Sequence, residues 1–172
     1  MQINLSELFA ADGMVREYDV PVEMEVFSCW EGEFPLVKKE PVHLMVTHTG
    51  NRCLEVTGEI RLFLLVPCDR CLTSVEVPFV LPVEKELDGN QDAAEESDEA
   101  YFYSGYYLDV DKLVNGELIV NLPMKVLCSP DCKGICKRCG KNLNEGPCAC
   151  DDRSPDPRMA AIRDIFNNFK EV

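Results

Sequence analysis

The sequence has few of the features that mark enzymes, membrane proteins or secreted proteins. Only two histidines and one tryptophan occur among 172 residues, and we find no Walker-type, GxGxxG or GxSxG motif. The longest apolar run, Leu62 to Pro67, is far shorter than the roughly 20 apolar residues that span a bilayer. The N-terminus lacks a basic start followed by an apolar run, so we expect no signal peptide. These absences predict a non-enzymatic cytoplasmic protein without a membrane or a small-molecule substrate.

The chain also has few basic residues relative to acidic ones. The chain has 17 Lys and Arg against 31 Asp and Glu, a net charge of −14, so an RNA-binding role requires a local basic patch. Residues 125–141 provide one, because five basic residues minus one acidic residue give +4. These cations either contact RNA phosphates or only balance the negative charge of nearby metal–thiolate centres. Four of them are candidate RNA contacts: Lys133, Lys137, Arg138 and Lys141.

Cysteine, in contrast, is abundant, with ten in the chain. Without a secretion signal, pairs spaced by two or three residues indicate metal knuckles rather than disulfides. Cys136-Lys-Arg-Cys139-Gly140 has this form, since both thiolates can reach one ion at about 2.3 Å and glycine permits the tight turn. Cys148-Ala-Cys150 can supply two more ligands. The first predicted structural zinc site is therefore Cys136, Cys139, Cys148 and Cys150.

A second zinc site is predicted from other cysteine pairs. Cys68-Asp-Arg-Cys71 lies at an expected hairpin turn, where zinc knuckles commonly occur, and the first site leaves Cys128 and Cys132 unassigned. Together these four would tie the sheet to the segment that follows the helix. The alternative is one C-terminal site with other ligands. The expected cofactor is thus structural Zn²⁺, as one or two ions.

Two other interpretations of the cysteines remain open. Cys68 and Cys71 could form a thiol–disulfide redox pair or a redox-sensing zinc switch. Thioredoxin-like chemistry favours such a motif at the start of a helix, whereas here it lies between two expected strands. Metal storage is the other possibility, and it predicts several exchangeable ions. Cys29 and Cys53 fall within expected strands and are interpreted as ordinary buried residues.

The hydrophobic pattern predicts an α+β fold, in which an antiparallel β-meander domain with one or two helices carries a C-terminal zinc-ribbon-like Cys module. Residues 1–87 form the β region. Pro78 and Pro82 cannot donate ladder hydrogen bonds, so the last strand lies at an edge or is broken. The expected strands are Tyr18–Phe27, Val42–Thr47, Cys53–Val66 and Leu72–Leu87.

The rest of the chain divides by composition. A helix is expected from Asp109, a good N-cap, to about Pro123, with Gly116 costing about 1 kcal/mol relative to alanine. The preceding acidic stretch has too little apolar surface to order itself. The expected segments are an acidic, disordered loop at 88–100, a helix completing the domain within 101–123, the Cys-rich module at 124–153 and a C-terminal helix at 154–172.

Several linked motifs together resemble the YceD-like family. They are Pro67-Cys-Asp-Arg-Cys-Leu72, the run from Leu127 to Asn144, Cys148-Ala-Cys150 and Asp156-Pro-Arg158. Members of this family are bacterial and plastid proteins linked to accumulation of 23S ribosomal RNA. The resemblance spans essentially the whole chain. It implies a non-enzymatic factor in large ribosomal subunit biogenesis, with 23S rRNA or a large-subunit ribosomal protein as its partner.

Overall fold

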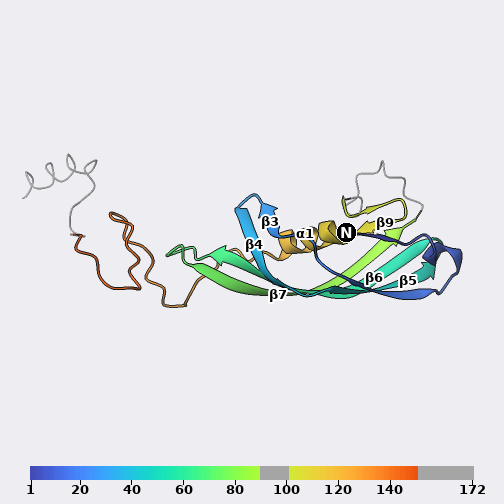
Figure 1. Ribbon diagram of the computed structural model, residues 1–172, viewed down its shortest axis with the longest axis horizontal. Helices are drawn as coiled ribbons and strands as arrows, with labels where there is room; N and C mark the ends of the chain where they lie inside the picture. Colours follow the sequence, from blue (N-terminus) through green and yellow to red (C-terminus); the bar gives the residue numbers. More distant parts are fainter. Residues whose placement is uncertain (90–100, 151–172) are drawn as a thin grey trace, which may run out of the picture.

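The computed structural model describes residues 1–89 and 101–150, which form antiparallel sheets and an α-helix laid over one sheet face (Figure 1). This arrangement confirms the predicted α+β fold. None of the helices in the described ranges has the length and apolar character needed to cross a bilayer. In chain order the elements are β1 (Gln2–Asn4), η1 (Leu8–Ala10), β2 (Val15–Val20), β3 (Val26–Cys29), β4 (Gly32–Lys39), β5 (Val42–Gly50), β6 (Cys53–Pro67), β7 (Ser74–Asp88), β8 (Tyr103–Ser104), β9 (Tyr107–Asp109) and α1 (Val110–Asn121).

The larger sheet has the strand order β2-β5-β6-β4-β3, with β7 paired to β6. Strands β5, β6 and β7 form the predicted meander, whereas β2 and β4 join it out of chain order. β7 pairs with no second strand in the described residues, which confirms the edge position predicted from Pro78 and Pro82. β6 and β7 pair along their whole length, from Cys53 opposite Asp88 to Pro67 opposite Ser74. Their hairpin therefore extends past the rest of the sheet (Figure 1).

Helix α1 begins and ends where the sequence predicts. The side chain of Asp109 accepts a hydrogen bond from the backbone N–H of Lys112, which makes it the N-cap. The helix ends at Asn121, two residues before Pro123, because a proline disfavours helical geometry in the residue before it. The apolar side chains that the helix buries are Val110, Leu113, Val114 and Leu118.

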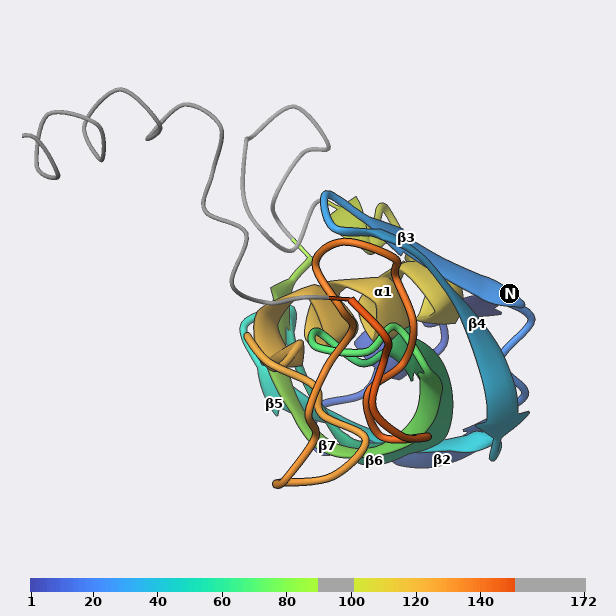
Figure 2. The ribbon, with the colours of Figure 1, turned by 90° about the vertical axis from the view of Figure 1, so that its left-hand side faces the viewer.

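The sheet curls around α1, and the core fills the space between them (Figure 2). Side chains from β3, β5, β6 and α1 are completely or almost completely buried there, each contributing about 1.5–3 kcal/mol. An ion pair between Lys85 of β7 and Glu117 of α1, with 2.7 Å between nitrogen and oxygen, closes one side of this layer. Among the largest buried side chains are Phe27, Leu44, Leu54, Ile60, Leu64 and Leu118.

Some elements differ from the sequence-based expectation. The predicted strand Tyr18–Phe27 is wrong as one continuous strand, because β2 ends just before Pro21 and β3 begins only at Val26. Strand β4 was not predicted, since its proline and lysines obscure the alternation. In the 101–123 segment, the part before the helix forms β8 and β9. Residues 90–100, 151–153 and the predicted helix 154–172 lie outside the described residues.

Two glycines provide a test of this packing. A Cβ on Gly58 would lie 2.2 Å from the carbonyl oxygen of His43, so Gly58→Ala must displace β5. We expect it to lower the free energy of unfolding by about 2–3 kcal/mol. A Cβ on Gly116 meets no atom within 4 Å, so Gly116→Ala should stabilise the helix by about 1 kcal/mol. Urea unfolding of both variants measures these effects, and equal effects would contradict the close approach of β5 and β6.

Candidate metal centres

The turn between β6 and β7 presents two cysteines, Cys68 and Cys71. The backbone N–H of Cys68 donates to the carbonyl of Thr73 at 2.9 Å, and that of Leu72 donates to the carbonyl of Cys68 at 2.8 Å. These bonds fold the turn tightly and put Leu72 at a φ of 61°, a left-handed conformation that costs a non-glycine residue about 1–2 kcal/mol. The turn therefore has the compact form of a metal knuckle.

Cys128 and Cys132 complete the first cluster, which we call the hairpin tetrad. The sulfur of Cys71 lies 3.5 Å from that of Cys128, and the sulfur of Cys68 lies 3.8 Å from that of Cys132. All four sulfurs lie within 4.8 Å of one another. A tetrahedron with metal–sulfur distances of about 2.3 Å has edges of about 3.8 Å. The hairpin tetrad is thus positioned to hold a metal ion.

Hydrogen bonds bring the segment after α1 to this turn. Asp69 binds Val126 twice: its backbone N–H donates to the carbonyl at 2.9 Å, and its carboxylate accepts from the Val126 N–H at 2.6 Å. The guanidinium of Arg70 donates to the carbonyl of Cys132 at 2.9 Å. Cys68 has 0% exposure, and Cys132 has 4%. Cys128 is the exposed member of the four. The hairpin tetrad is therefore a largely buried junction between the sheet and the C-terminal module.

Cys136, Cys139, Cys148 and Cys150 form the second cluster, which we call the distal tetrad. Their sulfurs also lie within 4.8 Å of one another, but their side chains are exposed or half-buried. Gly140 has a φ of 72° and donates its N–H to the carbonyl of Cys136 at 2.9 Å. It occupies the same place in its knuckle as the residue after Cys71 does in the hairpin. The distal tetrad is a second potential metal site, built within one loop.

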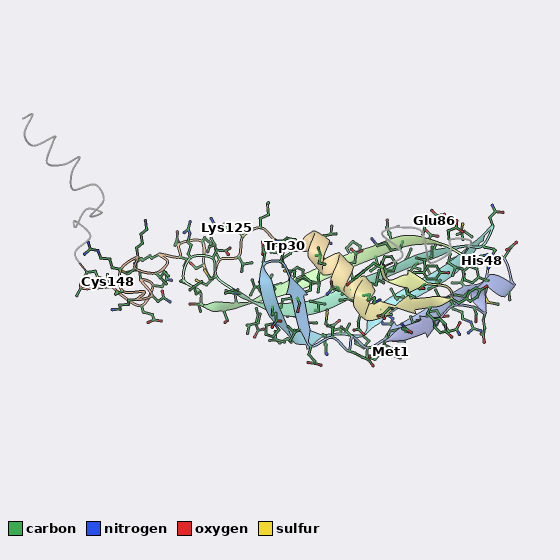
Figure 3. All side chains as sticks on the ribbon, turned by 90° about the horizontal axis from the view of Figure 1, so that it is seen from above. Met1, Trp30, His48, Glu86, Lys125 and Cys148 are labelled. Carbon is green, nitrogen blue, oxygen red and sulfur yellow. The ribbon has the colours of Figure 1, made fainter. Side chains whose placement is uncertain are left out.

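The loop that carries the distal tetrad (residues 134–150, the distal loop) directly contacts the turn that carries Cys68 and Cys71. The N–H of Ile135 donates to the carbonyl of Arg70 at 3.1 Å, and a Cβ on Gly134 would lie 3.0 Å from that oxygen. The side-chain amide of Asn144 donates to the sulfur of Cys132 at 3.3 Å. The two tetrads therefore belong to one continuous module at the end of the sheet, and Cys148 is the labelled residue farthest from the sheet in Figure 3.

The thiols of the hairpin tetrad do not ionise equally. Burial opposes ionisation of Cys68, but N–H groups of residues such as Cys128 and Arg70 bond its sulfur and lower the pKa of the thiol to about 6. Hydrogen bonding with Cys71 and other thiols raises the pKa of Cys128 to about 12. The pKa of the Cys132 thiol is also lowered, mainly because the side-chain amide of Asn144 donates to its sulfur. Some thiols of this cluster therefore ionise readily, but ionisation of all four requires a cation among the sulfurs.

The distal tetrad has the same electrostatic pattern. N–H groups of Cys139 and Arg138 lower the pKa of the Cys136 thiol to about 6. A hydrogen bond with Cys139 is the main reason that the pKa of Cys150 rises to about 12. Both clusters therefore have the donor chemistry of a site for a thiophilic cation, because a bound cation favours the thiolate form of every ligand.

The structure brings together the same eight cysteines, in the same two groups, that the spacing predicted. The candidate RNA contacts Lys133, Lys137, Arg138 and Lys141 are all exposed, and the Lys141 ammonium also donates to the carbonyl of Pro147 at 3.0 Å. Cys29 and Cys53 belong to neither tetrad and are half-buried in β3 and β6.

Sequence reasoning missed two residues that support the hairpin tetrad. The side chain of Asn144 bonds the sulfur of Cys132, and the carboxylate of Asp69 holds the backbone of Val126. For Asp69, its place between Cys68 and Cys71 was the available signal, because short acidic side chains often accept backbone N–H bonds in turns. For Asn144 the sequence held no comparable signal, since its contact depends on how the distal loop folds back.

Comparison with known proteins places this architecture in a family. The family model described as "Large ribosomal RNA subunit accumulation protein YceD" matches residues 56–166, which is more than half of the chain. The chain belongs to the YceD family. The match begins within β6 and covers all eight cysteines of the two tetrads. No solved structure matches the chain significantly.

Individual relatives of this YceD-family chain come from plants and bacteria. A maize protein named "Large ribosomal RNA subunit accumulation protein YCED homolog 1, chloroplastic" is 29% identical, over 96% of this chain and 66% of the maize protein. The Arabidopsis thaliana protein of the same name is 26% identical, over 76% and 44% of the two chains. The Bacillus subtilis "Uncharacterized protein YlbN" is 25% identical, over 67% and 66%. The chain thus spans slightly under two thirds of the maize and Bacillus relatives and less of the Arabidopsis one.

Proposed function

We propose that this chain is a non-enzymatic, zinc-binding factor in large ribosomal subunit biogenesis, which acts in the cytoplasm and supports processing or accumulation of 23S rRNA. The observation that carries the proposal is the hairpin tetrad, which joins the buried end of the sheet to a basic module. The family description and the names of the chloroplast relatives supply the link to large-subunit RNA.

The metal is proposed to be zinc in a structural role. Both tetrads consist of thiols alone, and four thiolates around one ion leave no open position for water or substrate. Structural zinc sites have this closed form, whereas catalytic ones retain an exchangeable ligand. Zinc in the hairpin tetrad would fix the module to the sheet, and zinc in the distal tetrad would shape its outer loop.

RNA contact is proposed for the module rather than for the sheet. Lys133, Lys137 and Arg138 are exposed on it. Some of their charge would offset the zinc–thiolate centres, but exposed cations also attract phosphate. A hollow on the sheet is lined by three glutamates, Glu55, Glu84 and Glu86, against the single cation of Lys85, and this negative balance would repel RNA there. RNA would therefore approach the molecule from the end that carries the metal module.

A redox role is the competing proposal, and the lowered pKa of Cys68 is its best support. However, the Cys68 side chain has no exposed surface, so a substrate disulfide cannot reach its sulfur without unfolding of the turn. An insulin-reduction assay on the zinc-loaded protein tests this alternative. We expect no activity above buffer, and turnover that Cys68→Ser abolishes would favour the redox role.

Depletion of the protein in its own organism tests the proposed function. We expect fewer large subunits on sucrose gradients and a lower ratio of 23S to 16S rRNA, both restored by a wild-type copy. An unchanged ratio and a normal large-subunit peak after depletion would contradict the proposal.

A further inference from the structure

The single tryptophan of the chain lies exposed near the base of the metal module. Trp30 occupies the turn between β3 and β4 and is 75% exposed, and Figure 3 shows it close to the end of α1 and to Lys125. Val120, in the last turn of α1, is 81% exposed, and Met124 is fully exposed. Trp30 directly precedes Glu31, and Glu31 and Met124 line one hollow. Exposed apolar patches commonly mark interaction sites, and tryptophan is enriched among the residues that dominate binding.

A hollow of about 240 Å³ lies between the β3–β4 hairpin, the end of β6 and the segment after α1. Its lining is mostly apolar but includes two acidic residues, Glu31 and Asp69, and no basic one. Glu31 forms no ion pair within the described residues. The complete lining is Glu31, Phe34, Val66, Pro67, Asp69, Leu122, Pro123, Met124 and Val126.

We infer that this hollow binds a basic polypeptide segment that inserts an apolar or aromatic side chain. The apolar lining provides a site for the anchor, while Glu31 and the neighbouring exposed Glu33 favour lysine or arginine beside it. The inference rests on the proposed function, because large-subunit ribosomal proteins would supply such segments. It goes further by assigning protein binding to a surface separate from the proposed RNA contacts.

Charge favours a basic polypeptide in the hollow over RNA, a second copy of the chain or the chain's own residues 151–172. RNA is disfavoured because Glu31, Glu33 and Asp69 would repel phosphate, and the adjacent Lys125 does not reverse that balance. A second copy of the chain carries a net charge of −14. The chain's own residues 151–172 contain four basic and five acidic residues. A basic protein segment is therefore the complementary partner.

Photo-crosslinking in cells tests this inference with the full-length chain. Met124 is replaced by the photoreactive residue benzoylphenylalanine, and the crosslinked peptides are identified by mass spectrometry. We expect a protein segment in which lysine or arginine flanks an apolar residue. The same replacement of Val80, which is 60% exposed on β7, is the control and should give at least about tenfold less of this product. Crosslinks mainly to RNA, a second copy, residues 151–172 or an acidic protein, or none above the control, would overturn the inference.

Variants at the hollow separate this inference from the proposed function. Trp30→Ser and Glu31→Lys should each reduce the Met124 crosslink by about tenfold or more, whereas Glu17→Lys on β2 should not. Zinc content and RNA binding are measured on the same variants and should not change. An undiminished crosslink in Trp30→Ser and Glu31→Lys would overturn the hollow as the binding site, whereas failure of RNA binding or of 23S accumulation would count against the proposed function alone.

Discussion

Replacing Cys68 with serine is expected to remove one zinc ion per chain and to destabilise the protein by about 3 kcal/mol or more, equivalent to a fall in Tm of about 6–12 °C. The side chain has 0% exposure, and its sulfur belongs to the cluster that joins β6 and β7 to the segment after α1. Loss of this ligand leaves the buried thiols of Cys71 and Cys132 and the exposed thiol of Cys128 without a closed site. Thermal unfolding combined with zinc analysis measures both effects.

Cys148→Ser is the matched control for this prediction. It also removes one thiolate, but from the distal tetrad, whose ligands all come from a single loop with partly exposed side chains. We therefore expect the loss of one zinc ion with a much smaller change in the Tm of the β domain. Equal destabilisation by Cys68→Ser and Cys148→Ser, or two retained zinc ions in either variant, would contradict the assignment of the hairpin tetrad as the structural junction.

Neutralising Lys133, Lys137 and Arg138 together, each to glutamine, is expected to weaken binding to 23S rRNA fragments and to flatten its salt dependence. Each phosphate contact contributes about 0.7–0.9 to the slope of log affinity against log salt. If all three cations contact phosphate, the slope should fall by about 2–3. Filter-binding or fluorescence-anisotropy titrations at several salt concentrations provide the measurement.

The control for this charge change lies on the sheet. Arg16, Lys38 and Arg61 are exposed, and each forms an ion pair with a glutamate. Changing these three to glutamine alters the net charge by the same amount, but the salt slope should stay close to that of the wild type. An equal loss of slope in the two triple variants would contradict the prediction, because RNA binding would then depend only on the overall charge of the protein.

The metal clusters could be predicted from the sequence because their chemistry is local. Two cysteines separated by two residues can share one ion whatever surrounds them, and glycine after Cys139 signals the left-handed turn that follows. The pairing of the hairpin cysteines with Cys128 and Cys132 followed from the number of cysteines left over. Helix α1 was predictable for a similar reason, since its cap and its apolar spacing both lie within one short segment.

The hollow near Trp30 could not be predicted, because it depends on contacts between distant parts of the chain. Trp30 is separated by more than ninety residues from Met124, and the hollow beside them exists because β3 and β4 fold back toward the end of β6. No local pattern encodes that approach. At Pro21 the local pattern itself was misleading. Apolar alternation continues on both sides of this residue and predicts one strand, yet the pairing of β2 with β5 stops at Val20.

We propose that two closed zinc–thiolate centres hold the basic module on the β domain. Native mass spectrometry of the purified full-length protein, with the bound element identified by plasma mass spectrometry, tests it most directly, because tetrahedral four-sulfur sites can also take iron. We predict two zinc ions per chain. An ion-free chain with paired cysteines, bound iron, or a variable and larger number of ions would contradict two closed zinc–thiolate centres.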